Sequence, residues 1–143
     1  MTPSLPDILV GNFLCFAEPP PPESAGEFMA GKVGVVALLS LLAAQEAERG
    51  LSARVWENAA IRAVLTEAAL AYGAVFAEAG AGADVDVTLS ALDRTNAALR
   101  RSLIALHEAV EAADDTTRDH AILRLYGAMA YARRLDMPPL PGH

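Results

Sequence analysis

The chain has 143 residues, which is enough for one ordinary domain with its own hydrophobic core. Its net charge is -7 and its eleven Lys and Arg residues are scattered, so a nucleic-acid partner is disfavoured, because such binding depends on clustered basic side chains. Alanine is abundant and strand-like alternation is rare, so the composition predicts an all-α fold.

The first predicted element is a short helix from about Leu5 to Ala17. Ser4 can cap this helix, and Pro6 suits its first turn. The single cysteine, Cys15, lies in an apolar run and has no partner for an internal disulfide. No basic segment of the kind that begins an export signal precedes it, so we expect a cytoplasmic protein.

Four consecutive prolines, Pro19 to Pro22, end this helix and favour an extended linker. Ser24 and Glu27 follow as a capping box that can start the next helix. The prolines are therefore predicted to be a spacer. The alternative, a ligand for a proline-binding domain, lacks the flanking basic residue that usually orients such docking.

The second helix is predicted from Ala25 to Arg49, with Gly50 as its C-terminal cap. Its most hydrophobic run, Val33 to Ala44, has 12 residues, fewer than the roughly 20 that cross a bilayer. Because the helix is apolar nearly all round between Phe28 and Ala44, we expect it to be the most buried helix of the fold.

A third helix is predicted to start after Ser52 and to continue to Ala79, followed by a flexible turn from Gly80 to Asp84. Its periodicity places one set of side chains toward the core and another toward solvent. The inward set is Trp56, Ala60, Val64, Ala71 and Val75, and the outward set is Arg54, Asn58 and Arg62.

The fourth helix, from about Asp84 to Ala113, carries a heptad seam. Its positions are Val85, Leu89, Leu92, Asn96, Leu99, Leu103, Leu106, Val110 and Ala113. Asn96 is the one polar member, and a buried asparagine can fix the register of two chains. Asn96, Leu99 and Leu103 are therefore candidate interface residues. The alternative is that Asn96 forms a hydrogen bond inside its own bundle.

A fifth helix is predicted to open at Thr116, with Asp119 completing a capping box, and to end near Leu135. A proline-rich tail, 136–143, follows. Together the elements predict a single domain over residues 1–143. It would be an antiparallel four-helix bundle over about 24–135 with an additional short N-terminal helix.

The residues that carry chemistry form no recognisable catalytic motif. There is no Glu-x-x-His of the di-iron bundles, no phosphate-binding loop and no Cys-x-x-Cys. His107 and Glu111 lie four residues apart and His120 is a conceivable third metal ligand, but the aspartates around them are typical of a solvated turn. We therefore assign no catalytic residue, metal or cofactor.

Two segments carry a family resemblance. Residues Phe28–Gly50 and Asp119–Pro139 resemble the two most regular helices of a small bacterial all-helical family of unknown function. Its genes often lie beside those of aminoglycoside-phosphotransferase-like kinases and acyl-CoA dehydrogenases. Where that family carries Arg, Asn and Arg-Glu, this chain has Lys32, Val36 and Gln45-Glu46. The resemblance implies an all-helical fold and carries over no functional residue.

Two functions follow as hypotheses. The first is a non-catalytic interaction or assembly module, expected to be homodimeric because of the seam. It would bind itself or another protein, would not bind nucleic acid and would not span a membrane. The second is a bundle that binds an acyl or aromatic ligand. Its pocket residues would be Trp56, Tyr72, Phe76, Tyr126 and Met129, which are equally suited to a plain core.

Overall fold

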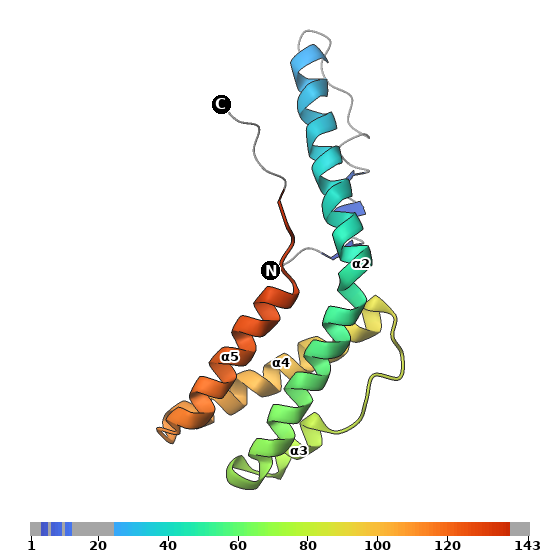
Figure 1. Cartoon of the computed structure of the whole chain (residues 1–143). Coiled ribbons are helices and arrows are strands. Elements are labelled where there is room, and N and C mark those ends of the chain that lie inside the picture. The colour runs from blue at the N-terminus through green and yellow to red at the C-terminus, as the bar shows by residue number, and fades with distance from the viewer. Residues whose placement is uncertain (1–3, 6, 10, 13–24, 138–143) are drawn as a thin grey trace. The chain divides into compact units, whose positions relative to one another are not determined.

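The structure, a computed structural model, describes residues 4, 5, 7–9, 11, 12 and 25–137 (Figure 1). Its helices are α2 (Ala25–Tyr72), α3 (Ala74–Gly80), α4 (Leu89–Ala112) and α5 (Thr116–Ala132). No residue in these ranges lies in a strand, which confirms the all-α prediction for the described part of the chain. Cys15 and the proline run fall outside it, as does the tail beyond residue 137.

The chain divides into two compact units, where the sequence predicted one domain. The first unit comprises Met1–Gly50 and Arg134–His143, and the second comprises Leu51–Arg133. Helix α2 contributes its first half to the first unit and its second half to the second.

The predicted helix end at Gly50 is wrong, because α2 continues through this residue to Tyr72. A glycine inside a helix costs only about 1 kcal/mol relative to alanine, and the helix formers on both sides outweigh that cost. The break comes at Gly73, whose φ of 116° favours a residue without a Cβ. The predicted third helix is thereby split into the second half of α2 and the short α3.

In the first unit, the apolar run of α2 is largely exposed, so the prediction that it is the most buried helix is wrong. Val33 is 54% exposed and Leu41 is 39% exposed. The described partners cover only part of this helix. Ile8 is buried, and Gly11 lies beside Leu39. Among the described residues, no helix combines the length and hydrophobicity needed to cross a membrane.

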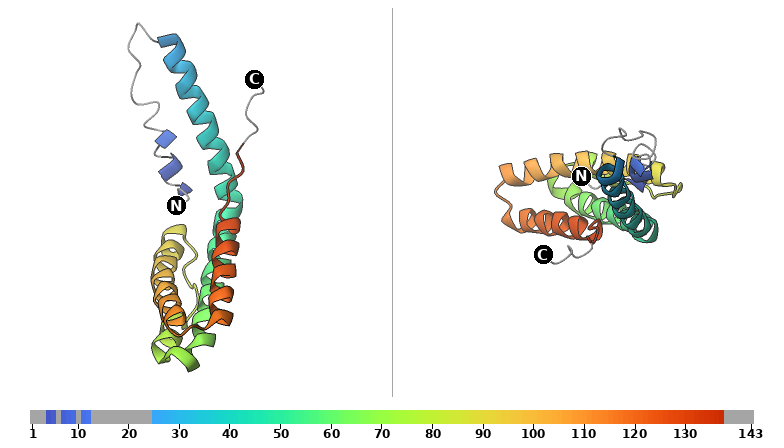
Figure 2. Two further views of the ribbon diagram at one scale, coloured as in Figure 1. Left: turned by 90° about the vertical axis from the view of Figure 1, so that its left-hand side faces the viewer. Right: turned by 90° about the horizontal axis from the view of Figure 1, so that it is seen from above.

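The second unit holds the main hydrophobic core. Its members are Ile61, Leu65, Ala68, Phe76, Leu99, Leu103, Leu106, Val110, Ile122, Leu125 and Met129. The second half of α2 and α4 run in the same direction. Asn58 contacts Leu92 near the beginning of α4, and Tyr72, the last residue of α2, contacts Asp115 just beyond the end of α4. Helix α5 runs back along α4 after a tight turn (Figures 1 and 2). The segment Ala74–Thr88 makes this parallel pairing possible, because it connects the end of α2 to the beginning of α4.

The middle of the predicted heptad seam is confirmed. Its buried members on α4 are Leu92, Asn96, Leu99, Leu103, Leu106 and Val110. The seam starts later than predicted, since α4 begins at Leu89 and Val85 is 94% exposed. At α5 the capping residue is Asp115 rather than Thr116, because the Asp115 carboxylate accepts a hydrogen bond from the Arg118 backbone N–H.

Candidate functional site

Three polar residues of α2 are buried within the second unit, to which they belong. Arg54 is 4% exposed, and both Glu57 and Asn58 are fully buried. The prediction had Arg54 and Asn58 facing solvent and Trp56 facing the core, whereas Trp56 is 43% exposed. The physical reason is pairing: each of the buried polar groups meets a polar partner from another part of the unit, which offsets the cost of its desolvation.

Glu57 lies between two arginines. Its Oε1 accepts a hydrogen bond from Arg100 Nε at 2.9 Å, and its Oε2 accepts one from Arg133 Nε at 2.6 Å. The buried carboxylate therefore joins α2 to α4 and to the chain just after α5. Beside it, Arg54 Nε donates to Asp93 Oδ1 at 2.7 Å, and Arg133 Nη1 lies 4.0 Å from the same oxygen.

A second chain of hydrogen bonds starts at Asn58. Its Oδ1 accepts from Asn96 Nδ2 at 2.9 Å, and its Nδ2 donates to Asp84 Oδ2 at 3.1 Å. Asp84 also accepts from Arg62 Nη2 at 2.8 Å. The hydrogen bond from Arg62, supported by the one from Asn58, lowers the pKa of the Asp84 carboxyl below its ordinary value, against the opposing effect of burial.

The three candidate interface residues lie inside this unit. Leu99 and Leu103 belong to the hydrophobic core, and Asn96 is satisfied by Asn58 of the same chain. This corrects the expectation that they form a face between two copies, because buried side chains have no surface to offer a partner. The intramolecular alternative for Asn96 is the arrangement that the structure shows.

The five candidate pocket residues do not gather in one place. Trp56 is exposed, and Phe76 packs in the core. Tyr72 donates its hydroxyl to Asp115 at 3.0 Å. Only Tyr126 and Met129 line a common cavity.

The cavity beside Tyr126 and Met129 has a volume of about 460 Å³ and is otherwise lined by Arg100, Ile104 and Ala130. This volume is within the range of small-molecule sites. Met129 forms a buried apolar wall and Ile104 an exposed one. The sequence suggested Tyr126 and Met129, but Arg100 was missed because its neighbour Arg101 made the pair resemble an ordinary solvated doublet.

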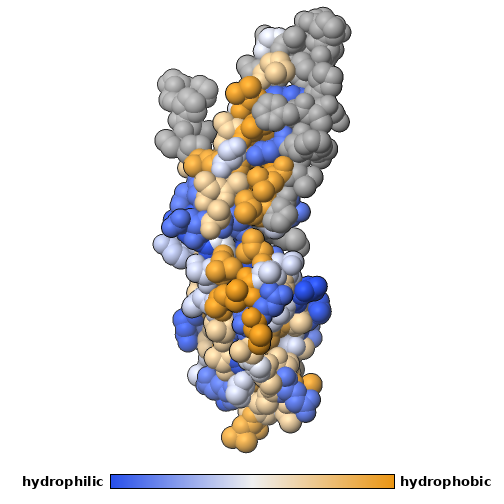
Figure 3. Space-filling model, turned by 90° about the vertical axis from the view of Figure 1, so that its right-hand side faces the viewer, coloured by the Kyte–Doolittle hydropathy of each residue, from blue (hydrophilic) through white to orange (hydrophobic). Residues whose placement is uncertain are grey.

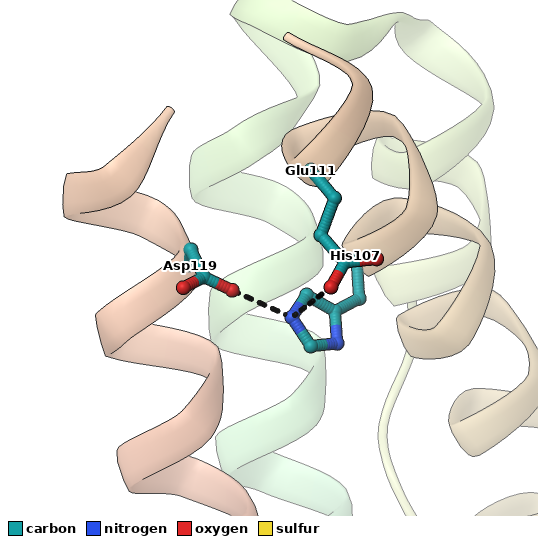
Figure 4. A group of neighbouring side chains, drawn as sticks. All are labelled: His107, Glu111 and Asp119. Atoms are coloured by element: carbon teal, nitrogen blue, oxygen red, sulfur yellow. Dashed lines mark hydrogen bonds and ion pairs between the residues drawn. The ribbon is translucent and has the colours of Figure 1, made fainter. Parts of the chain in front are cut away.

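A third cluster lies where α4 meets α5. His107 Nε2 is 2.8 Å from Asp119 Oδ1 and 3.9 Å from Glu111 Oε1 (Figure 4). One donor atom from each of the three residues falls within 4.8 Å of the other two. Such a set has the donor types that a zinc ion takes. The sequence proposed His120 as the third ligand, but the structure brings Asp119 to this place and leaves His120 exposed.

The close pairing of His107 with Asp119 has a structural use that requires no metal. It ties the last third of α4 to the first turn of α5, and the His107 ring also contacts the Tyr126 ring at a centroid distance of 5.5 Å. The cluster therefore fixes one side of Tyr126, whose other surroundings include the cavity.

Comparison of the chain with protein-family models, with curated proteins and with solved structures gives no match. The functional argument therefore depends on the residues themselves.

Proposed function

We propose that this protein is a non-catalytic helical assembly module that pairs with a second copy of itself. The observation that carries the proposal is the exposed apolar face of α2 in the first unit. Apolar side chains that lie together on a helix surface are typical of protein interfaces, because leaving them in water is unfavourable. This face takes the place of the α4 seam as the proposed contact between two copies.

The face follows one side of the helix. Its members are Met29, Val33, Ala37, Leu41 and Ala44, at steps of four, four, four and three residues, and all five are exposed and uncharged. That spacing keeps side chains in one line along an α-helix. Figure 3 shows exposed hydrophobic side chains, among polar ones, on one side of the molecule. A Cβ built on Gly34 would meet open space, so another helix can approach closely there.

A second copy is the occupant that we favour, because an uncharged apolar face is complementary to itself and a two-fold axis closes the assembly. The four-helix bundle predicted from the sequence enters as part of this proposal. Each copy would supply two antiparallel helical stretches, namely the N-terminal helical residues around Ile8 and the first half of α2. A Cβ built on Gly11 would lie 3.7 Å from Leu39 Cδ1, and this proximity supports the pairing of the two stretches within one copy.

Solution mass tests the proposal directly. Light scattering after size-exclusion chromatography should give a dimer for the wild type and a monomer for Val33→Glu and Leu41→Glu, because a charge on the face must be desolvated on pairing. Leu70→Glu is the matched control, since Leu70 is fully exposed on α2 but belongs to the second unit. A wild type that stays monomeric throughout the micromolar range would remove the proposal.

The family resemblance and the cytoplasmic location remain proposals alongside this one. The helical pattern of Phe28–Gly50 and Asp119–Pro139 supports the first, and the lone Cys15 supports the second. Should the wild type prove monomeric, an enzyme of the kinds encoded beside that family is the partner to test on the same α2 face.

A further inference from the structure

The cavity between α4 and α5 has a polar and an apolar part. Arg100 and Tyr126 supply the polar groups, and Ile104, Met129 and Ala130 supply the apolar lining. Sites of this kind orient a small molecule by a few polar contacts and hold the rest of it by apolar contact. The chemical class of the ligand can therefore be read from the polar groups.

The guanidinium of Arg100 is held in place from behind. Nε and Nη2 of Arg100 lie 2.9 and 2.8 Å from Oε1 of the fully buried Glu57. The Arg100 side chain is nevertheless 44% exposed. A guanidinium has five N–H donors, so donors remain after the contacts with Glu57 are made. Arg100 thus presents an oriented cation to the cavity without the entropy cost of fixing a free side chain.

The carboxylate that holds Arg100 is shared with a second arginine. Glu57 Oε1 accepts from Arg100 and Glu57 Oε2 accepts from Arg133, so two guanidiniums share one negative charge. The Nη2 atom of Arg133 is buried and has no hydrogen-bond partner. Glu57 therefore does not fully neutralise Arg100, which favours an anionic ligand at the cavity.

Tyr126 adds a neutral donor. Its ring lines the cavity, and its hydroxyl has no hydrogen-bond partner among the described residues. Burial raises the pKa of Tyr126 above its ordinary value, although the charge of Arg100 opposes this, so the hydroxyl stays protonated at neutral pH. A carboxylate at the cavity could then accept hydrogen bonds from both the guanidinium and the phenol.

We propose that this cavity binds a monocarboxylate with an apolar tail, whose head group lies on Arg100 and Tyr126 and whose tail lies against Ile104, Met129 and Ala130. The proposal concerns the second unit and does not depend on assembly through α2. A phosphate ester is the competing ligand class, but it would bring a second negative charge close to the Glu57 carboxylate behind Arg100, whereas a monocarboxylate brings one.

Isothermal titration of the full chain tests the proposal with octanoate as the probe. Octanoate should bind, octanol and octylamine should bind at least about tenfold more weakly, and inorganic phosphate should not compete. Arg100→Gln should weaken octanoate binding by about tenfold or more, and Tyr126→Phe by a smaller factor. Arg101→Gln is the matched control and should leave the affinity unchanged, because Arg101 does not line the cavity.

Loss of the contact with Glu57 could unfold Arg100→Gln, so a second variant keeps the test decisive. Ala130→Trp places a large side chain on the exposed edge of the cavity and should abolish octanoate binding while circular dichroism stays helical. The proposal is overturned if octanoate does not bind the wild type, if octanol binds equally well, if Arg101→Gln weakens binding as much as Arg100→Gln, or if Ala130→Trp binds normally.

Discussion

Asn96 Nδ2 donates to Asn58 Oδ1 across 2.9 Å in the interior of the second unit. Replacing Asn96 with leucine removes the donor and leaves the buried Asn58 oxygen without this partner. We expect Asn96→Leu to lower the free energy of unfolding by about 1–3 kcal/mol, measured by urea denaturation. Its solution mass should equal that of the wild type. Ala97→Leu, on the exposed side of α4, is the control and should change stability little.

Asp84 makes stability depend on pH in the acid range. Arg62 and Asn58 hold the pKa of Asp84 in the folded state below the ordinary value of 3.8. A depressed pKa contributes stability that is fully present above the ordinary value and is lost as the pH falls through the folded-state value. The stability difference between wild type and Asp84→Asn should therefore be largest near neutral pH and shrink below about pH 4. A difference that grew on acidification would contradict this role.

We expect neutralising Glu57 to lower the free energy of unfolding more than neutralising any other single polar residue. Glu57→Gln keeps the shape of the side chain but removes the charge shared by Arg100 and Arg133. Breaking a buried pair by removing one partner typically costs about 3–5 kcal/mol. The lower end applies here, because Arg100 can turn toward solvent. Chemical denaturation measures the loss, and Glu67→Gln, on an exposed part of α2, is the control.

Gly80 marks a close approach between α3 and α2. A Cβ at this position would lie 2.9 Å from the backbone oxygen of Arg62 and 3.2 Å from Leu65 Cβ. Gly80→Ala should therefore lower the unfolding free energy by about 1–3 kcal/mol. Gly127→Ala, within α5, is the contrasting variant, because a Cβ at that position would meet open space. Higher helix propensity should raise stability there by up to about 1 kcal/mol, so thermal midpoints of the two variants should move in opposite directions.

The sequence predicts this fold well where one helix face determines the outcome. The α4 residues from Leu92 to Val110 repeat at heptad spacing, and hydrophobic periodicity alone correctly identifies their burial. The same reasoning fails on α2, because it assumes that Arg54 and Asn58 face water. Their burial depends on partners that lie 39 and 38 residues away in the chain, and no local pattern shows these partners.

The candidate site was foreseen only in part for the same reason. Tyr126 and Met129 share a helix face, so their common position was predictable from spacing. The contribution of Arg100 requires knowing that α4 packs beside α5 and that Glu57 fixes the guanidinium from a third segment. The exposure of Val33 on α2 was also unpredictable, since hydrophobicity indicates a need for burial but not whether the chain itself supplies a cover.

The parallel course of α2 and α4 has a consequence for the order of folding. Helices α4 and α5 are neighbours across a tight turn, so their pairing closes a short loop and can form early. Glu57 and Arg133 are instead separated by 76 residues, so their contact closes a long loop at a larger cost in chain entropy. We expect this ion pair to close after the rate-limiting step, so that Glu57→Gln speeds unfolding and leaves the refolding rate nearly unchanged in stopped-flow measurements. The buried carboxylate would then determine how slowly the native state unfolds, and it would have little effect on how fast that state forms.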